Sequence, residues 1–352
     1  MMKLDYLTEQ YRGKRVLVTG HSGFKGTWLT KILIKVGAEV QGYAKDEYKF
    51  AEDLNKASFN SVQGDIRDGE AFGKVVSEFS PEIVFHLAAQ PLVYRSYEDP
   101  IETFQTNVLG SVNLLETVRI NPSIKALVFV TSDKCYENNE WIWGYRENDR
   151  LGGKDPYSAS KACSEIIFNS YWESYFKQNL NTLCCSVRAG NVIGGGDWSD
   201  NRIVPDAMKA LFADQTLLIR NPNATRPWQH VLEPLSGYLL VGSKLLQKEV
   251  IATGSWNFGP AIDDIRSVQD VALALQNLVS SGRVKVNSDA EQLHEAGLLK
   301  LNCDKAEALL SWKPRWQFDE MIKKTVEWYK FYYNNGDISE IYHGQIEEFF
   351  NQ

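Results

Sequence analysis

The sequence predicts an α/β protein built on a doubly wound parallel sheet with a smaller mixed α/β domain. Apolar and β-branched runs of strand length alternate with helix-length segments through the first half of the chain. A glycine-rich loop joins the first of these runs to the first helical segment, and turn-rich sequence follows Gly190. Strands that alternate with helices form right-handed crossovers, and such crossovers produce a parallel sheet.

Continuous apolar runs mark the individual strands, and a helix is expected over 26–36. The expected strands are 14–19, 37–43, 81–87, 126–130 and 184–188, with a short extended stretch at 61–64. Cys184 and Cys185 are neighbours in the last run, so they should point to opposite faces of the sheet. The five cysteines are an odd number without CxxC spacing, which favours reduced thiols in a cytoplasmic protein.

The charge and composition of the chain exclude several classes of function. The 352 residues carry a formal charge of −7, so the chain lacks the positive field that draws proteins to nucleic acids or anionic membranes. No apolar run approaches the roughly 20 residues that cross a bilayer, and the first 15 residues do not resemble a signal peptide. The five histidines form no ligand cluster, so no metal site is expected.

The loop after the first strand carries a GxxGxxG spacing at Gly20, Gly23 and Gly26. Glycines there permit a tight turn and a close approach of backbone to pyrophosphate, and the helix N-terminus then holds the phosphates. This is the signature of a Rossmann-type dinucleotide site. Asp65 and Ile66, after the short extended stretch, are expected at the same site.

The acid that usually binds the ribose at the end of the second strand is missing. Ala44 and Lys45 occupy that place, and Asp46 comes slightly late. A basic residue there could accept the 2′-phosphate of NADP. NAD is the expected cofactor, with NADP left open.

Two groups of polar residues suggest the chemistry. Tyr157 and Lys161 lie four positions apart and share a helix face, where Lys161 and an oxidised nicotinamide would favour the phenolate. Ser132, Asp133 and Lys134 directly follow the 126–130 strand, at the sheet edge where α/β proteins bind ligands.

With these motifs the chain resembles the extended short-chain dehydrogenase/reductase family, and within its nucleotide-sugar group it is similar to the CDP-glucose 4,6-dehydratases. The resemblance covers nearly the whole chain. Its motifs are the Gly20 loop, 86–90, 107–110, Tyr157/Lys161, 188–198, 226–231, 294–296 and 312–314. The 190–198 and 226–231 segments and Asp133-Lys134 are the specific ones.

The resemblance implies dehydration of CDP-glucose to the 4-dehydro-6-deoxy sugar, a step toward deoxysugars of surface polysaccharide such as O-antigen. Tyr157, supported by Lys161 and Ser132, would take the O4 proton while hydride leaves C4 for NAD. Asp133 would protonate the departing O6, for which burial should raise its pKa. Lys134 would act as the C5 base or stabilise the enolate, and the residues leave both roles open.

The resemblance also assigns binding residues and domains. The cofactor contacts are Gly20, Ser22, Gly23, Phe24, Lys25, Gly26, Asp65, Ile66, Leu87, Ala88, Ala89, Asn107, Tyr157 and Lys161. The substrate contacts are Gln90, Asn191, Arg202, Arg226 and His230. The cofactor domain would comprise 13–190 plus about 229–262, and the nucleotide-sugar domain 191–228 plus 263–352.

Two other functions fit part of the pattern. A nucleotide-sugar 4-epimerase would share the glycine loop, Tyr157 and Lys161, but would have no use for the acid and amine at Asp133 and Lys134. A non-catalytic dinucleotide-binding module would need none of the catalytic residues. The family suggests a homodimer or homotetramer built on helix contacts.

Overall fold

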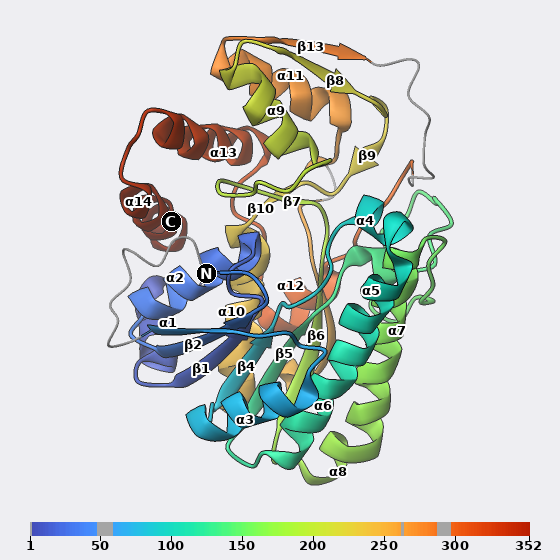
Figure 1. Ribbon diagram of the computed structural model, residues 1–352, viewed down its shortest axis with the longest axis vertical. Coiled ribbons are helices and arrows are strands. Elements are labelled where there is room, and N and C mark those ends of the chain that lie inside the picture. The colour runs from blue at the N-terminus through green and yellow to red at the C-terminus, as the bar shows by residue number, and fades with distance from the viewer. Residues whose placement is uncertain (1, 48–58, 262–263, 287–296) are drawn as a thin grey trace.

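The computed structural model describes residues 2–47, 59–261, 264–286 and 297–352, and its centre is a seven-stranded sheet (Figure 1). The strands are β1 (Arg15–Thr19), β2 (Glu39–Ala44), β3 (Phe59–Gln63), β4 (Ile83–His86), β5 (Ala126–Val130), β6 (Leu183–Ala189) and β11 (Gly254–Phe258). Their order is β11-β6-β5-β4-β1-β2-β3, and every neighbouring pair is parallel. The predicted doubly wound fold is confirmed.

Helices cover both faces of this sheet. One face carries α1 (Leu4–Tyr11), α2 (Phe24–Lys35) and α10 (Leu232–Leu246), and the other carries α3 (Gly69–Phe79), α6 (Gly110–Ile120) and α7 (Pro156–Tyr171). Successive strand residues alternate between two hydrophobic clusters, since Cys185 packs with the first set of helices and Cys184 with the second. The expectation that these two thiols face opposite ways is therefore confirmed.

Short elements connect the main helices and strands. They are α4 (Val93–Glu98), α5 (Pro100–Phe104), the π-helical η1 (Gln105–Leu109) and η3 (Trp172–Phe176), the 3-10 turns η2 (Asp133–Cys135) and η4 (Val250–Ala252), α8 (Lys177–Asn179) and α12 (Asp304–Leu310). The predicted helix over 26–36 begins two residues earlier, because Gly23 is its extended N-cap.

A second lobe lies above the carboxyl ends of the strands (Figure 1). It contains α9 (Ile203–Phe212), α11 (Val268–Val279), β7 (Val192–Ile193), β8 (Thr216–Ile219), β9 (Thr225–Arg226), β10 (Gln229–His230), β12 (Arg266–Ser267) and β13 (Arg283–Val286). The last helices, α13 (Phe318–Tyr333) and α14 (Ile338–Asn351), continue the core at the side, where α14 packs on α2. One hydrophobic cluster runs from the sheet into this lobe, so the proposed domain boundaries remain a prediction.

The strand order places the ligand crevice. β1 lies between β2 and β4, and the chain reverses its direction across the sheet at the β1/β4 junction. Open α/β sheets bind ligands outside the carboxyl ends of their strands at such a junction.

The 294–296 motif lies outside the described residues. No helix among the described residues is long and apolar enough to cross a bilayer.

Candidate active site

A cavity of about 990 Å³ opens at the carboxyl ends of the strands, between the sheet and the second lobe. Every predicted site residue lines it except Asn107 and His230. The lining includes Gly20, Ser22, Gly23, Phe24, Lys25, Gly26, Asp65, Ile66, Leu87, Ala88, Ala89, Gln90, Ser132, Asp133, Lys134, Tyr157, Lys161, Asn191, Arg202 and Arg226. Residues up to 206 positions apart in the chain thus share one chamber, as the motifs predict.

The glycine loop is built for close packing. Gly20 has a φ of 70°, and a Cβ there would meet the Ala88 backbone nitrogen at 2.7 Å. A Cβ on Gly26 would overlap the carbonyl oxygen of Gly20. Without side chains at these positions the turn packs tightly, and the N-terminus of α2 lines the cavity. Such a helix end binds phosphate.

Tyr157 and Lys161 lie in the first two turns of α7. Asp155 caps this helix by accepting a hydrogen bond from the Ser158 amide at 2.9 Å. Burial raises the pKa of Tyr157 to about 12, and a hydrogen bond with Ser132 opposes the rise. Burial lowers the pKa of Lys161 to about 8. In the protein alone the net shift on Tyr157 is upward, so the expected lowering of its pKa by Lys161 is not seen without the nicotinamide charge.

The acid and amine follow β5 on the 3-10 turn. Ser132 caps this turn: its hydroxyl accepts a hydrogen bond from the Lys134 amide at 3.2 Å and donates one to Asp133 Oδ1 at 3.0 Å. Asp133 is 3% exposed, and Oδ2 has no hydrogen-bond partner among the described residues. Burial raises the pKa of Asp133, against the opposing effect of Lys134. The expected rise in its pKa is therefore confirmed.

A buried ion pair supports the catalytic residues from below. Arg188 on β6 donates hydrogen bonds to both carboxylate oxygens of Glu165 on α7, at 2.8 and 2.7 Å. Thr131 and Ser186 donate to the same carboxylate. The pair is almost fully buried and ties β5, β6 and α7 together directly beneath Ser132 and Tyr157. No motif identified this carboxylate, because its partners lie 21 to 34 positions away in the chain.

Lys25 faces the cavity, and its pKa falls to about 8 because of burial, with Arg202 adding to the effect and Asp133 opposing it. Its ammonium lies 6.0 Å from the ring centre of Tyr238 on α10. Tyr238 is fully buried, does not line the cavity, and its hydroxyl has no hydrogen-bond partner in the described chain.

The second lobe contributes cationic groups. Arg226 on β9 is 6% exposed, and its guanidinium donates to the Thr225 carbonyl at 2.9 Å. Arg202 forms an ion pair with Asp197 at 3.1 Å and is one-third exposed. Asn191 lines the cavity between them and the sheet. These groups can hold the pyrophosphate of a nucleotide sugar by charge-assisted hydrogen bonds.

Three predicted residues make contacts with the surrounding protein, although His230 Nε2 has no hydrogen-bond partner among the described residues. His230 is fully buried between Trp28 and Trp316, with ring centres at 5.8 and 4.7 Å, and does not line the cavity. Asn107 bonds the backbone of Gln90 and donates to Ser160 at 2.8 Å.

The Gln90 side chain amide donates to Leu92 O and Thr103 Oγ1, and its oxygen accepts from the Leu92 amide. These contacts position the loop after β4. Direct ligand contacts by Gln90, Asn107 and His230 remain predictions, and their hydrogen bonds and burial do not favour them.

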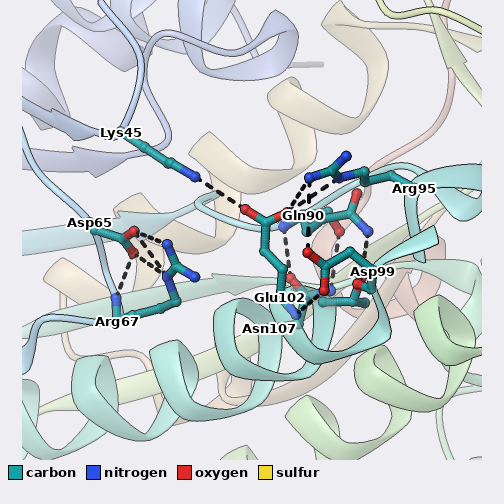
Figure 2. Close-up of polar contacts among 9 residues, drawn as sticks. Lys45, Asp65, Arg67, Gln90, Arg95, Asp99, Glu102 and Asn107 are labelled. Atoms are coloured by element: carbon teal, nitrogen blue, oxygen red, sulfur yellow. Dashed lines mark hydrogen bonds and ion pairs between the residues drawn. The ribbon is translucent and has the colours of Figure 1, made fainter. Parts of the chain in front are cut away.

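Ion pairs gather at the far end of the cavity, beside the carboxyl end of β2 (Figure 2). Lys45 pairs with Glu102 on α5 at 3.1 Å, and Arg95 on α4 pairs with the same carboxylate at 3.1 Å. Asp65 is held by the guanidinium of Arg67 at 2.5 Å, which lowers the pKa of the Asp65 carboxyl.

Known proteins resemble this chain over most of its length. It is 46% identical over 336 residues to the CDP-glucose 4,6-dehydratase of Salmonella typhimurium, covering 93% of this chain and 94% of that protein. It is 28% identical to a UDP-glucose 4-epimerase of Mycolicibacterium smegmatis, over 90% of this chain and 98% of the relative.

Solved structures of related enzymes share the fold of this chain. The UDP-glucose 4-epimerase of Thermus thermophilus, solved with NAD, superposes with a TM-score of 0.76 at 26% identity, over 90% of this chain and 99% of that one. An epimerase of Methanothermobacter thermautotrophicus reaches a TM-score of 0.83 at 24% identity, over 94% and 96% of the two chains. The family model for GDP-mannose 4,6 dehydratase matches residues 17–325, and the chain therefore belongs to that family.

Proposed function

We propose that this protein is an NAD-dependent hydro-lyase that converts CDP-glucose to CDP-4-dehydro-6-deoxyglucose. The observation that carries the proposal is the meeting of Asp133, Lys134 and Tyr157 in one cavity, with the Asp133 carboxyl buried and its pKa raised. The 46% identity to a CDP-glucose 4,6-dehydratase supports the substrate. The product would serve the synthesis of deoxysugars for surface polysaccharide.

The cavity fits NAD at its β1 end. Gly20 and Gly26 allow the tight turn that brings the N-terminus of α2 to the cavity, where it would hold the pyrophosphate, and Lys161 lines the same chamber. When bound, NAD supplies the acceptor for the C4 hydride and the donor that returns it to C6. The Thermus epimerase solved with NAD has the same fold, which supports this choice of cofactor.

Tyr157 would begin the reaction by removing the O4 proton. With a pKa of about 12 the phenol of Tyr157 is almost fully protonated at neutral pH in the protein alone, so the positive nicotinamide would have to supply the remaining stabilisation of the phenolate. Ser132, hydrogen-bonded to Tyr157, orients the phenol oxygen toward the chamber. The ketone formed at C4 then acidifies the hydrogen on C5.

Asp133 and Lys134 would carry out the elimination. Burial raises the pKa of the Asp133 carboxyl and so favours its protonated form, which would give its proton to the departing O6. Lys134 lies one residue further on the same turn and lines the same cavity, where it can take the C5 proton or stabilise the enolate. Arg226 and Arg202 would hold the substrate pyrophosphate from the second lobe.

Incubation with CDP-, dTDP-, UDP- and GDP-glucose tests the proposal. We expect a 4-keto-6-deoxy product, with its alkaline absorbance, from CDP-glucose alone. Turnover of another nucleotide sugar instead would overturn the substrate. Formation of CDP-galactose without loss of water would show an epimerase, the function that the Mycolicibacterium relative has and that would leave Asp133 and Lys134 unused.

We further propose that the protein forms a homodimer, or a homotetramer made of two such dimers, through α5, α6 and α7. These helices lie side by side (Figure 1) and carry exposed apolar side chains. The largest exposed fractions on them are those of Ile101 (69%), Ile120 (60%) and Ile166 (57%). Such a surface fits a second copy better than water. Ile166→Glu should convert the dimer to a monomer in analytical ultracentrifugation, and an unchanged mass would refute this interface.

The cytoplasm is the proposed compartment. All five cysteines are free thiols, and Cys135, Cys184 and Cys185 are buried. A reducing compartment keeps thiols in this state.

A further inference from the structure

The carboxyl end of β2 presents a lysine where an acid is expected. In dinucleotide-binding folds, an Asp or Glu at this place accepts hydrogen bonds from the adenosine ribose, and a basic residue binds the 2′-phosphate of NADP. Here Ala44 ends the strand, and the exposed Lys45 follows it on the cavity wall. Taken alone, β2 would favour NADP.

The structure supplies an acid from a different element. Figure 2 shows Glu102 of α5 between Lys45 and Arg95. Lys45 Nζ donates to Glu102 Oε1 at 3.1 Å, and Arg95 donates to Oε2 through Nε at 3.3 Å and Nη2 at 3.1 Å. Glu102 is 21% exposed, whereas the two cations are 61% and 50% exposed. The carboxylate is thus fixed between two cations and faces the cavity.

This carboxylate keeps capacity for a ligand. A carboxylate has about four lone-pair positions, and Oε1 of Glu102 accepts only the bond from Lys45 among the described residues. The contacts with Lys45 and Arg95 lower the pKa of Glu102, so it stays ionised at neutral pH. A ribose hydroxyl can donate to Oε1 without disturbing either ion pair.

We propose that Glu102 selects NAD over NADP by accepting the ribose 2′-hydroxyl, with Lys45 as the residue that positions it. The inference rests on the proposed use of a nicotinamide dinucleotide in this cavity. Glu102 takes the role of the missing β2 acid, although it is contributed by α5, 57 positions beyond Lys45. Lys45 is neutralised by Glu102 and is therefore not available to a 2′-phosphate.

Charge balance gives the preference its direction. A 2′-phosphate would place a second anion beside the Glu102 carboxylate, and like charges side by side repel. Removing the carboxylate charge would release the ammonium of Lys45 toward the phosphate. Glu102→Gln should therefore weaken NAD binding and strengthen NADP binding at the same time, which a merely structural role would not do.

The test is titration calorimetry of NAD and of NADP against the full-length enzyme after bound nucleotide has been removed. A hydrogen bond to a charged group contributes enough for Glu102→Gln to weaken NAD about tenfold or more. We expect NADP to tighten by a similar factor. The double variant Lys45→Met/Glu102→Gln should not bind NADP more tightly than wild type, because it also removes the released cation.

Glu98→Gln is the matched control, since it removes one negative charge near Arg95 (3.8 Å) without touching Lys45. It should leave the ratio of NAD to NADP affinity within about twofold of wild type. Thermal unfolding of each variant checks that the fold is intact. If Glu102→Gln folds, binds NAD and dehydrates substrate with an unchanged NAD/NADP ratio, the inference is overturned while the proposed function stands. If the wild type binds neither dinucleotide, the proposed function itself fails.

Discussion

Asp133→Asn separates the oxidation of the sugar from the loss of water. The amide keeps the size of the carboxyl group but has no acidic proton to give to O6. General acids contribute roughly 10²–10⁴-fold to a reaction, which corresponds to about 3–5 kcal/mol of barrier. Tyr157, Lys161 and the cofactor end of the cavity are untouched, so C4 oxidation should proceed while dehydration slows by that factor.

The same substitution should stabilise the folded protein. Burial raises the pKa of Asp133, so the folded state holds this proton more tightly than the unfolded chain does. Its stabilising contribution is therefore complete at low pH and is lost as pH rises through the raised pKa. The neutral amide does not lose a stabilising contribution as pH rises. At neutral pH, Asp133→Asn should therefore raise the free energy of unfolding by roughly 1 kcal/mol, in the range of a single stabilising substitution.

A single-turnover experiment with CDP-glucose measures the kinetic effect. The variant should accumulate the absorbance of reduced nicotinamide, while the 4-keto-6-deoxy product appears slowly. Wild type should show little accumulation. Product formation at the wild-type rate would refute the assignment of Asp133 as the acid, and loss of the nicotinamide signal would show that Asp133 acts before elimination.

Three more predictions follow. Glu165→Ala should lower the free energy of unfolding by roughly 3–5 kcal/mol, because Arg188 would stay charged and buried without its partner. Unfolding in urea measures this change, and a loss below about 1 kcal/mol would contradict a structural role for the pair. Burial raises the pKa of Glu233 to about 7 from 4.5, so its stabilising contribution is complete below pH 4.5 and disappears as pH rises through 7. Glu233→Gln should flatten this pH dependence of thermal unfolding, and an identical profile would exclude Glu233 as its source. The pKa values of Lys25 and Lys161 fall to about 8, so binding of anionic CDP-glucose should take up protons near pH 8 and weaken at higher pH. Calorimetry in buffers of different ionisation enthalpy would detect this uptake, and equal heats in all buffers would contradict it.

The sequence predicted the features that depend on local pattern. The strand at 126–130 has the expected bounds, and its alternation of faces follows from the twofold period of a strand. Gly20 and Gly26 stand where the backbone approaches too closely for a side chain. Tyr157 and Lys161 share a helix face because four positions make slightly more than one turn. In each case the relevant geometry is contained within a few consecutive residues.

Tertiary contacts decided what the pattern could not predict. Glu102 and Lys45 are ordinary charged residues in sequence, and only the tertiary structure brings the residue after β2 to the carboxylate on α5. His230 belongs to a family-specific motif, yet the turn at β10 directs its ring between two tryptophans and away from the cavity. A motif establishes that a segment is near the site, whereas the direction of each side chain depends on the tertiary contacts around it.

The protein has a net charge of −7, yet the ligands of the proposed reaction are anions. The positions of its cations explain how such a protein can bind them. Lys25, Lys161 and Arg226 line the cavity, and burial raises the pKa of the nearby Asp133, which favours its neutral form. Burial lowers the pKa values of both ammonium groups, and for Lys25 the nearby Arg202 and Lys161 add to the effect. A bound pyrophosphate close to these groups would favour their charged forms. The protein thus concentrates positive charge in the one place where anions bind, so attraction to its small ligands does not require attraction to polyanions.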